Sequence, residues 1–321
     1  MRRFKMFITL LITSVLLFSL SGCGSDKEDD NKNGNITDET DDLKVTPDAG
    51  AKEDDDTGTE EDKDNTSVDE TDIDSDKVTI QEQVLFDKEK IKITAISMEE
   101  DIYLGPEIKL MIENNGDTDV TVQARELSIN GFMIEPVFST EVAAGKKSND
   151  SLAFYVEELE ANGIDKIASI DFKFDIFSTE TWDTLVESDT IILETSAKGK
   201  YEQKYDTSGK NIYDDSNFKI IDKGLDISDE IMGPQIRLYI ENNSSEGITV
   251  QVRDVSINGF MIEPAFSREI SPGKKANDGI SFWDLEENDI VDITDVELKF
   301  DIFNTETWDT IVETDVIKLQ Y

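Results

Sequence analysis

The feature that most constrains this chain is an internal repeat with a period of about 126–128 residues. Between Gly105 and Tyr155, roughly 30 of 51 positions recur 128 residues later, and the nine residues Ser128 to Pro136 recur unchanged as Ser256 to Pro264. Other shared motifs are Gly105-Pro106 with Gly233-Pro234, Glu113-Asn114-Asn115 with Glu241-Asn242-Asn243, Gly145-Lys146-Lys147 with Gly273-Lys274-Lys275, and Glu180 to Thr184 with Glu306 to Thr310. A repeat of this length predicts two folded copies of one unit, although a recent duplication would preserve residues whether or not they work.

Apolar and polar residues alternate within each copy. In the first copy this holds for Ile108, Leu110 and Ile112, and for Ile170, Phe172, Phe174 and Ile176; in the second it holds for Ile236, Leu238 and Ile240, and for Val296, Leu298, Phe300 and Ile302. A period of two is typical of half-buried β-strands. The sequence therefore predicts strands with one face toward a core.

Turn residues divide these strands at short spacing. Asn130-Gly131 and Asn258-Gly259 favour type I′ hairpins, and Ser271-Pro272-Gly273 favours a type II turn. Short helical turns are expected at Glu157 to Gly163 and at Asp284 to Asn288. Seven or eight strands in each copy predict an all-β chain of two tandem antiparallel immunoglobulin-like β-sandwich domains, residues 79–196 and 205–321, joined by residues 197–204.

The N-terminus has the pattern of an export signal. A basic start, Met1 to Lys5, precedes the apolar run Met6 to Leu20, which is shorter than a membrane-spanning helix needs; an uncleaved anchor helix is the alternative. Leu20-Ser21-Gly22-Cys23 resembles the lipobox of bacterial lipoproteins, which implies cleavage after residue 22 and a diacylglycerol thioether on Cys23. We expect an extracytoplasmic protein held to the cell membrane by this lipid, unless the cysteine is there by chance.

Charge limits the partners of the chain. The formal net charge is −42, or about −45 without the three basic residues of the leader, and this excludes most nucleic-acid roles. Residues 23–78 are strongly acidic and poor in apolar side chains, so they predict a disordered tether. A calcium site or a cationic partner on this tether is the alternative.

Catalytic residue types are scarce. The chain contains no histidine and a single cysteine, so it has no Ser-His or Cys-His couple and no intramolecular disulfide. We therefore expect a non-enzymatic interaction or spacer module for an unknown envelope protein or glycan. A glycan- or calcium-binding surface module is the alternative, and an envelope hydrolase is a more distant one.

A family resemblance agrees with this interpretation. The motifs that carry it are Val84-Leu85-Phe86-Asp87, Ile91-Lys92-Ile93, Gly105-Pro106, Glu113-Asn114-Asn115, Asn130-Gly131, Gly145-Lys146-Lys147 and Leu159 to Gly163. Their order resembles uncharacterised immunoglobulin-like modules of Gram-positive lipoproteins, across both copies from about Thr79 to Tyr321. The resemblance implies an envelope location and a sandwich fold, and it brings no catalytic residues.

Large aromatic residues are candidate ligand-binding groups. Trp182 and Trp308 follow acidic turns, and Tyr155 and Trp283 occupy equivalent positions in the two copies. Exposed rings of this kind could stack on sugars. We instead expect core packing for all four, because large aromatic side chains are mostly buried.

Two further groups stand out. Carboxylates near one strand end are weak calcium candidates, namely Asp175, Glu180, Asp183, Glu187 and Asp189 with Asp301, Glu306, Asp309, Glu313 and Asp315. The hairpin tip around Asn130 and its copy present apolar residues beside a turn, where alternation predicts that Phe132 and Ile134 are buried and that Met133 lies on the other face. Hairpin packing is the expectation there, and an interaction hot spot is the alternative.

Overall fold

A computed structural model describes residues 77–228, 233–283 and 285–321. The expected signal peptide, the lipobox Leu20 to Gly22, Cys23 and the tether up to residue 76 lie outside the described residues. The described chain is built from antiparallel β-sheets, with one short helix, α2 (Val156–Ala161), and one 3-10 turn, η1 (Glu286–Asn288). The all-β expectation is confirmed, and both helical turns lie where the sequence predicted them.

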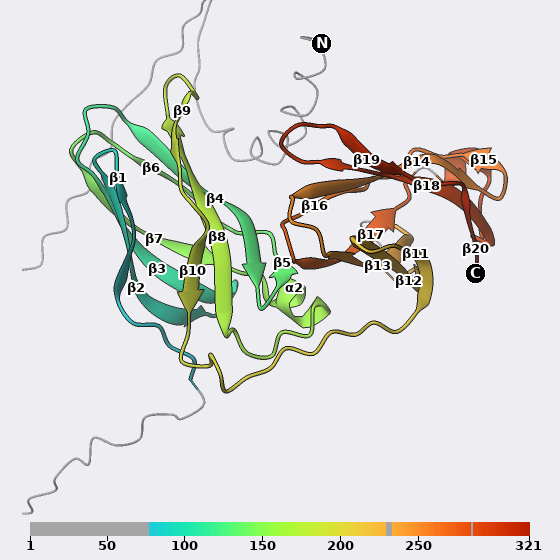
Figure 1. Cartoon of the computed structure of the whole chain (residues 1–321), viewed down its shortest axis with the longest axis horizontal. Coiled ribbons are helices and arrows are strands. Elements are labelled where there is room, and N and C mark those ends of the chain that lie inside the picture. The colour runs from blue at the N-terminus through green and yellow to red at the C-terminus, as the bar shows by residue number, and fades with distance from the viewer. Residues whose placement is uncertain (1–76, 229–232, 284) are drawn as a thin grey trace, which may run out of the picture. The chain divides into compact units, whose positions relative to one another are not determined.

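The first copy, repeat 1, forms a two-layer sandwich of immunoglobulin-like type (Figure 1). One sheet has the order β1-β2-β3-β7, and the other has β8 and β4 at its centre, with β9 and β10 beside β8 and with β5 and β6 beside β4. The strands are β1 (Gln83–Lys88), β2 (Ile91–Asp101), β3 (Gly105–Asn114), β4 (Val120–Ile129), β5 (Phe132–Met133), β6 (Ser139–Val142), β7 (Lys147–Ala153), β8 (Ser169–Ser178), β9 (Thr184–Glu187) and β10 (Ile191–Glu194).

The second copy, repeat 2, has the same pairing. Strands β11, β12, β13 and β17 correspond to β1, β2, β3 and β7, while β14, β15, β16, β18, β19 and β20 form the other sheet. Their bounds are β11 (Lys210–Asp214), β12 (Phe218–Asp226), β13 (Gln235–Asn242), β14 (Ile248–Ile257), β15 (Phe260–Met261), β16 (Ser267–Ile270), β17 (Lys275–Ser281), β18 (Asp295–Asn304), β19 (Thr310–Glu313) and β20 (Ile317–Gln320).

Each core is built from the alternating residues that the sequence indicates. On β8 the side chains of Ile170, Phe172, Phe174 and Ile176 are fully buried, and on β18 those of Val296, Leu298, Phe300 and Ile302 are equally so. Inward apolar side chains on facing sheets supply the main stabilisation of a sandwich, because burial removes their surface from water. The predicted strand faces are confirmed.

The predicted turns are also confirmed. Asn130 and Gly131 both have positive φ angles, of 51° and 92°, as a type I′ turn requires, and Asn258 and Gly259 repeat them. At Ser271 the backbone carbonyl accepts a hydrogen bond from the Lys274 amide at 3.1 Å, which closes the predicted tight turn.

The shared Asn motif has a structural role. The side-chain amide of Asn114 is buried and donates to the carbonyls of Thr118 and Val142, at 2.8 and 2.9 Å, while its oxygen accepts from the Gly116 amide. Asn242 does the same in repeat 2 with Glu246, Ile270 and Ser244. These asparagines hold the loop after β3 or β13 in place, which accounts for the motif without a functional site.

A parallel strand pair joins the two repeats. β5 of repeat 1 pairs with β17 of repeat 2, with Phe132 opposite Lys275, and the Lys275 amide donates to the Gly131 carbonyl at 2.9 Å. This pair makes one ten-stranded sheet from the second sheet of repeat 1 and the first sheet of repeat 2.

Neither helical segment of the described residues has the length and apolar character of a membrane span.

Candidate functional site

Two tryptophans occupy the same strained turn in the two repeats. Trp182 follows β8 and Trp308 follows β18, with positive φ angles of 62° and 63°. The turns are closed alike: the Trp182 amide donates to the Ser178 carbonyl and the Trp308 amide to the Asn304 carbonyl, each at 2.9 Å. A non-glycine residue in the left-handed region costs about 1–3 kcal/mol, so a bulky side chain there is unusual.

Both tryptophans are exposed. Trp182 is 72% exposed and Trp308 is 56% exposed, and each lies nearly flat on a buried phenylalanine of the preceding strand, with an interplanar angle of 21°. The underlying rings are Phe177 and Phe303, at centroid distances of 5.4 and 5.3 Å. The expectation that these tryptophans fill the core is wrong. Each ring lies over a buried phenylalanine that follows the inward-facing Ile176 or Ile302 and belongs to neither core cluster.

The second aromatic pair is also partly exposed. Tyr155 is 45% exposed and Trp283 is 50% exposed, so core packing is wrong for this pair too. Tyr155 is the residue before α2, and its carbonyl accepts from the amides of Glu158 and Leu159. Tyr155 and Trp283 thus lie just after the ends of β7 and β17, respectively.

The candidate calcium ligands do not converge. Among the described residues there is no group of three or more acidic or cysteine side chains arranged to hold a metal ion. Asp175 is instead held beside Arg125, with 4.0 Å between its Oδ2 and the arginine Nε, and Asp301 is held beside Arg253 at 3.7 Å. Burial raises the pKa of Asp175 although the Arg125 cation opposes this effect. The structure therefore brings no three of these strand-end carboxylates together.

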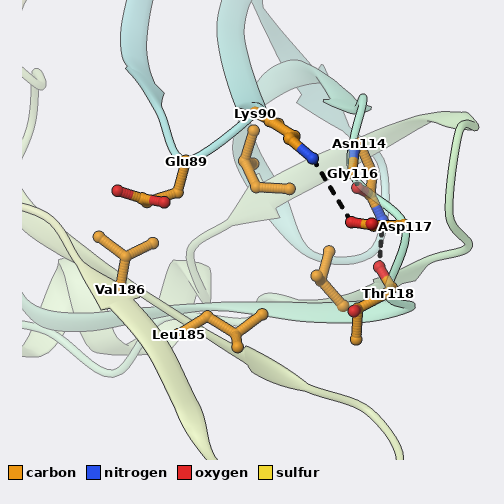
Figure 2. A pocket seen from close by; sticks show the side chains of 10 residues that line it. Glu89, Lys90, Asn114, Gly116, Asp117, Thr118, Leu185 and Val186 are labelled. Carbon is orange, nitrogen blue, oxygen red and sulfur yellow. Dashed lines mark hydrogen bonds and ion pairs between the residues drawn. The ribbon is translucent and has the colours of Figure 1, made fainter.

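A small cavity lies at one end of repeat 1 (Figure 2). It has a volume of about 230 Å³ and lies between the β1–β2 turn, the loop after β3 and the start of β9. Figure 2 shows the Lys90 ammonium directed at the Asp117 carboxylate, 3.5 Å away, with Leu185 and Val186 across the opening. Its ten lining residues include no serine, cysteine or histidine, and the cavity is smaller than the roughly 300–1,000 Å³ of ordinary small-molecule sites.

The hairpin tip of repeat 1 is buried at the junction of the repeats. Phe132 is 1% exposed and its ring contacts those of Tyr205, the first residue of repeat 2, and Tyr239, on β13, at centroid distances of 5.3 and 6.3 Å. Met133 belongs to the core cluster of repeat 2 and is also buried. The prediction that Phe132 and Ile134 are buried is confirmed, and Met133 does lie on another face, but that face is covered by repeat 2.

Charged and polar groups surround this junction. Arg268 on β16 donates to the Met133 carbonyl at 2.8 Å and to the Glu135 carboxylate at 3.0 Å. Lys274 forms an ion pair with Asp171, across the two repeats. The Lys275 ammonium lies over the Tyr205 ring, 4.4 Å from its centroid, and the Tyr205 hydroxyl donates to the Asn130 carbonyl at 2.9 Å. The junction therefore combines an apolar centre with a polar rim, as stable interfaces do.

One residue difference between the repeats marks this junction. Tyr239 lies at an outward position of β13, yet it is fully buried, whereas Met111 at the same position of β3 is partly exposed. A large aromatic residue in place of a smaller one on the solvent face of a strand marks a covered surface. The partner that covers it lies more than 100 residues away, so the pattern alone does not identify it.

Comparisons with known proteins find only distant structural similarity. No protein-family model matches the chain, and no curated protein matches its sequence. Among solved structures, the YadV chaperone is 13% identical, with 72% of this chain and 100% of that chain covered and a TM-score of 0.24. A chaperone–tip adhesion subunit complex of the Csu pili of Acinetobacter baumannii is 13% identical, with 67% and 92% covered and a TM-score of 0.20. A Porphyromonas gingivalis protein of unknown function has a TM-score of 0.19 at 12% identity, with 67% and 91% covered.

These TM-scores are too low to carry an argument about activity. The similarity to immunoglobulin-like pilus chaperones is distant, and the sandwich assignment rests on the strand pairing of this chain.

Proposed function

We propose that this chain is a lipid-anchored, non-catalytic protein of the bacterial cell envelope whose duplicated sandwiches serve as an interaction or spacer module. The apolar leader and the Leu20 to Cys23 motif support the anchor, and the acidic segment that follows supports a spacer between membrane and sandwiches. The absence of histidine from the sequence supports a non-catalytic role, as does the lining of the small cavity in repeat 1.

The pair of exposed tryptophans carries the proposal of an interaction module. Glycine would form the left-handed turn without strain, but both repeats use a tryptophan there and leave one face of its ring open to solvent. An observed backbone strain at an exposed aromatic residue is a reason to infer binding rather than packing. Trp182 and Trp308 together also provide two equivalent surfaces, which favours a ligand with repeated units.

A glycan is the candidate ligand that the two exposed tryptophans favour. Flat exposed aromatic rings suit the apolar faces of sugar rings, and cell-wall glycans offer repeated units to the two turns. The proposal is tested on the full chain by calorimetric titration with cell-wall glycan fragments, comparing the wild type with a Trp182→Gly and Trp308→Gly double variant. Glycine keeps the left-handed turn, so the variant retains the fold while it loses both rings.

We expect the double variant to bind at least about fivefold more weakly, since each aromatic stack contributes about 0.5–1.5 kcal/mol. Tyr103→Ala is the matched control, because Tyr103 is 86% exposed in a loop away from these turns, and we expect it to bind as the wild type does. No heat of binding at millimolar glycan, or equal affinity in the double variant, would exclude the glycan candidate.

The anchor is tested separately. We expect Cys23→Ser to release the protein from the cell membrane into the medium, because the thioether that holds the lipid cannot form. Unchanged membrane retention of this variant would contradict lipidation at Cys23.

A further inference from the structure

One nine-residue sequence occurs in two environments. Ser128 to Pro136 and Ser256 to Pro264 are identical and form the same hairpin, but the first lies at the junction and the second does not. Phe132 and Met133 are 1% and 5% exposed, whereas their counterparts Phe260 and Met261 are 49% and 68% exposed. Among the described strands β15 ends its sheet, whereas β5 continues through β17.

The surface that receives the hairpin has a counterpart in repeat 1, with Thr94 and Met111 in place of Ile221 and Tyr239. In repeat 2 it is the outer face of β12, β13 and β17, where Ile221 and Tyr239 are buried in one cluster with the core of repeat 1. In repeat 1 the corresponding strand β7 is the last strand of its sheet, and Lys147 occupies the position of Lys275 within the same Gly-Lys-Lys motif.

The corresponding face of repeat 1 is open. A hollow of about 360 Å³ lies over β2, β3 and β7, lined by Ile96, Lys109 and Asn149 among others. Ile96 is 37% exposed there. In repeat 2 the counterpart of Asn149 is Asn277, whose side-chain amide donates to the Asn162 side chain beyond α2 at 3.1 Å. Repeat 1 therefore presents an unfilled version of a surface that is filled in repeat 2.

We propose that a second copy of this chain fills it: the β15 hairpin of one molecule pairs in parallel with β7 of the next, with Phe260 opposite Lys147. The geometry is that of the β5–β17 pair inside the chain, so the occupant is inferred from the contact that the identical hairpin of repeat 1 already makes there. The contact is head-to-tail, and each added molecule leaves one free hairpin and one free β7 edge. Such a heterologous contact builds an open series rather than a closed pair.

The contact between molecules is weaker than the one within the chain. Repeat 1 has Thr140 at the position of Arg268, so the ion pair that Arg268 makes with Glu135 has no equivalent between molecules. The charges of the other ion pair are kept, because Lys146 and Glu297 occupy the positions of Lys274 and Asp171. The junction inside the chain also gains from the connection, which provides an effective concentration in the millimolar range. Association of acidic molecules therefore needs salt to screen their repulsion, or a high local concentration.

This inference goes beyond the proposed function and depends neither on the lipid anchor nor on the tryptophans. The first test is sedimentation velocity of the full chain in mild detergent at about 0.15 M salt, where the screening length is about 8 Å. We expect wild-type protein to form a concentration-dependent series of oligomers, and a Phe260→Asp and Met261→Asp double variant to stay monomeric. Val316→Asp is the control for an added charge at another exposed apolar residue of repeat 2, and we expect it to associate normally.

A second test fixes the register. Two full-length chains with different tags are co-expressed, one with Phe260→Cys and the other with Lys147→Cys, and we expect a disulfide between them on oxidation, because paired strand residues lie within reach of such a bond. Val84→Cys on β1, the opposite edge of the same sheet, is the matched control and should give no cross-link with Phe260→Cys. A pair of chains without the added cysteines keeps Cys23 as its sole cysteine, and it measures the background cross-linking through that residue. Monomeric wild-type protein, or equal cross-linking at residues 84 and 147, would overturn the proposal.

Discussion

The two identical hairpins allow a stability experiment with an internal control. Phe132→Ala and Phe260→Ala remove the same side chain from the same nine-residue sequence, so the two variants share their local hairpin propensity. They differ in what covers the ring. Phe132 is enclosed by Tyr205 and Tyr239, whereas Phe260 is half exposed.

The expected difference follows from burial. Truncation of a fully buried phenylalanine costs about 3–5 kcal/mol, which includes the cavity that remains between the two tyrosines. Full burial of such a side chain contributes about 1.5–3 kcal/mol, so half burial of Phe260 corresponds to about 0.8–1.5 kcal/mol, with little cavity because water fills the site. We therefore expect Phe132→Ala to lower the free energy of unfolding by about 1.5–4 kcal/mol more than Phe260→Ala does.

Urea unfolding of the full chain, followed by tryptophan fluorescence and circular dichroism at a concentration where the protein is monomeric, measures this difference. The junction couples the repeats, so we also expect Phe132→Ala to separate the unfolding curve into two transitions. If the two variants lose equal stability, or if Phe260→Ala is the more damaging, the inference that repeat 2 covers the first hairpin is refuted.

Three further expectations concern other contacts. Asn114→Ala should lower the free energy of unfolding by about 1–3 kcal/mol, because it leaves the carbonyl of the buried Val142 without its donor, and thermal melting checks this. Gly209→Ala should destabilise the protein by more than about 2 kcal/mol, since a Cβ would lie 2.4 Å from the Asp222 carbonyl oxygen, whereas Gly199→Ala, which meets nothing within 4 Å, should cost about 1 kcal/mol; comparable melting curves for the two would contradict the steric argument. Burial raises the pKa of Asp278, although the Arg268 cation opposes this effect. The protonated Asp278 carboxyl therefore stabilises the fold at pH values below 3.8, the ordinary pKa of aspartate, and this stabilisation is lost as the pH rises through the raised pKa. As the pH rises through this range, the urea midpoint should fall less steeply in Asp278→Asn than in the wild type. Parallel profiles would show that Asp278 does not cause the pH dependence.

Local features of the chain were predictable because their causes are local. The alternation from Ile170 to Ile176 determines which side of β8 faces the core, and Asn130-Gly131 determines the hairpin, since both depend on residues close in sequence. The exposure of Trp182 was not predictable in this way. Its direction depends on a left-handed backbone angle held by the turn after β8, and its ring lies over Phe177, which is buried outside the core cluster.

The sequence by itself determined the repeat, the strand faces, the tight turns and the scarcity of catalytic residue types. The tertiary structure alone decided which of two identical hairpins is buried. Nine residues that fold the same way carry the same intrinsic preferences, but burial depends on what lies against them, and for Phe132 that is a surface of β13 and β17 more than 100 residues away. Solvent exposure is a property of the assembled surface, so identical sequences can differ in it completely.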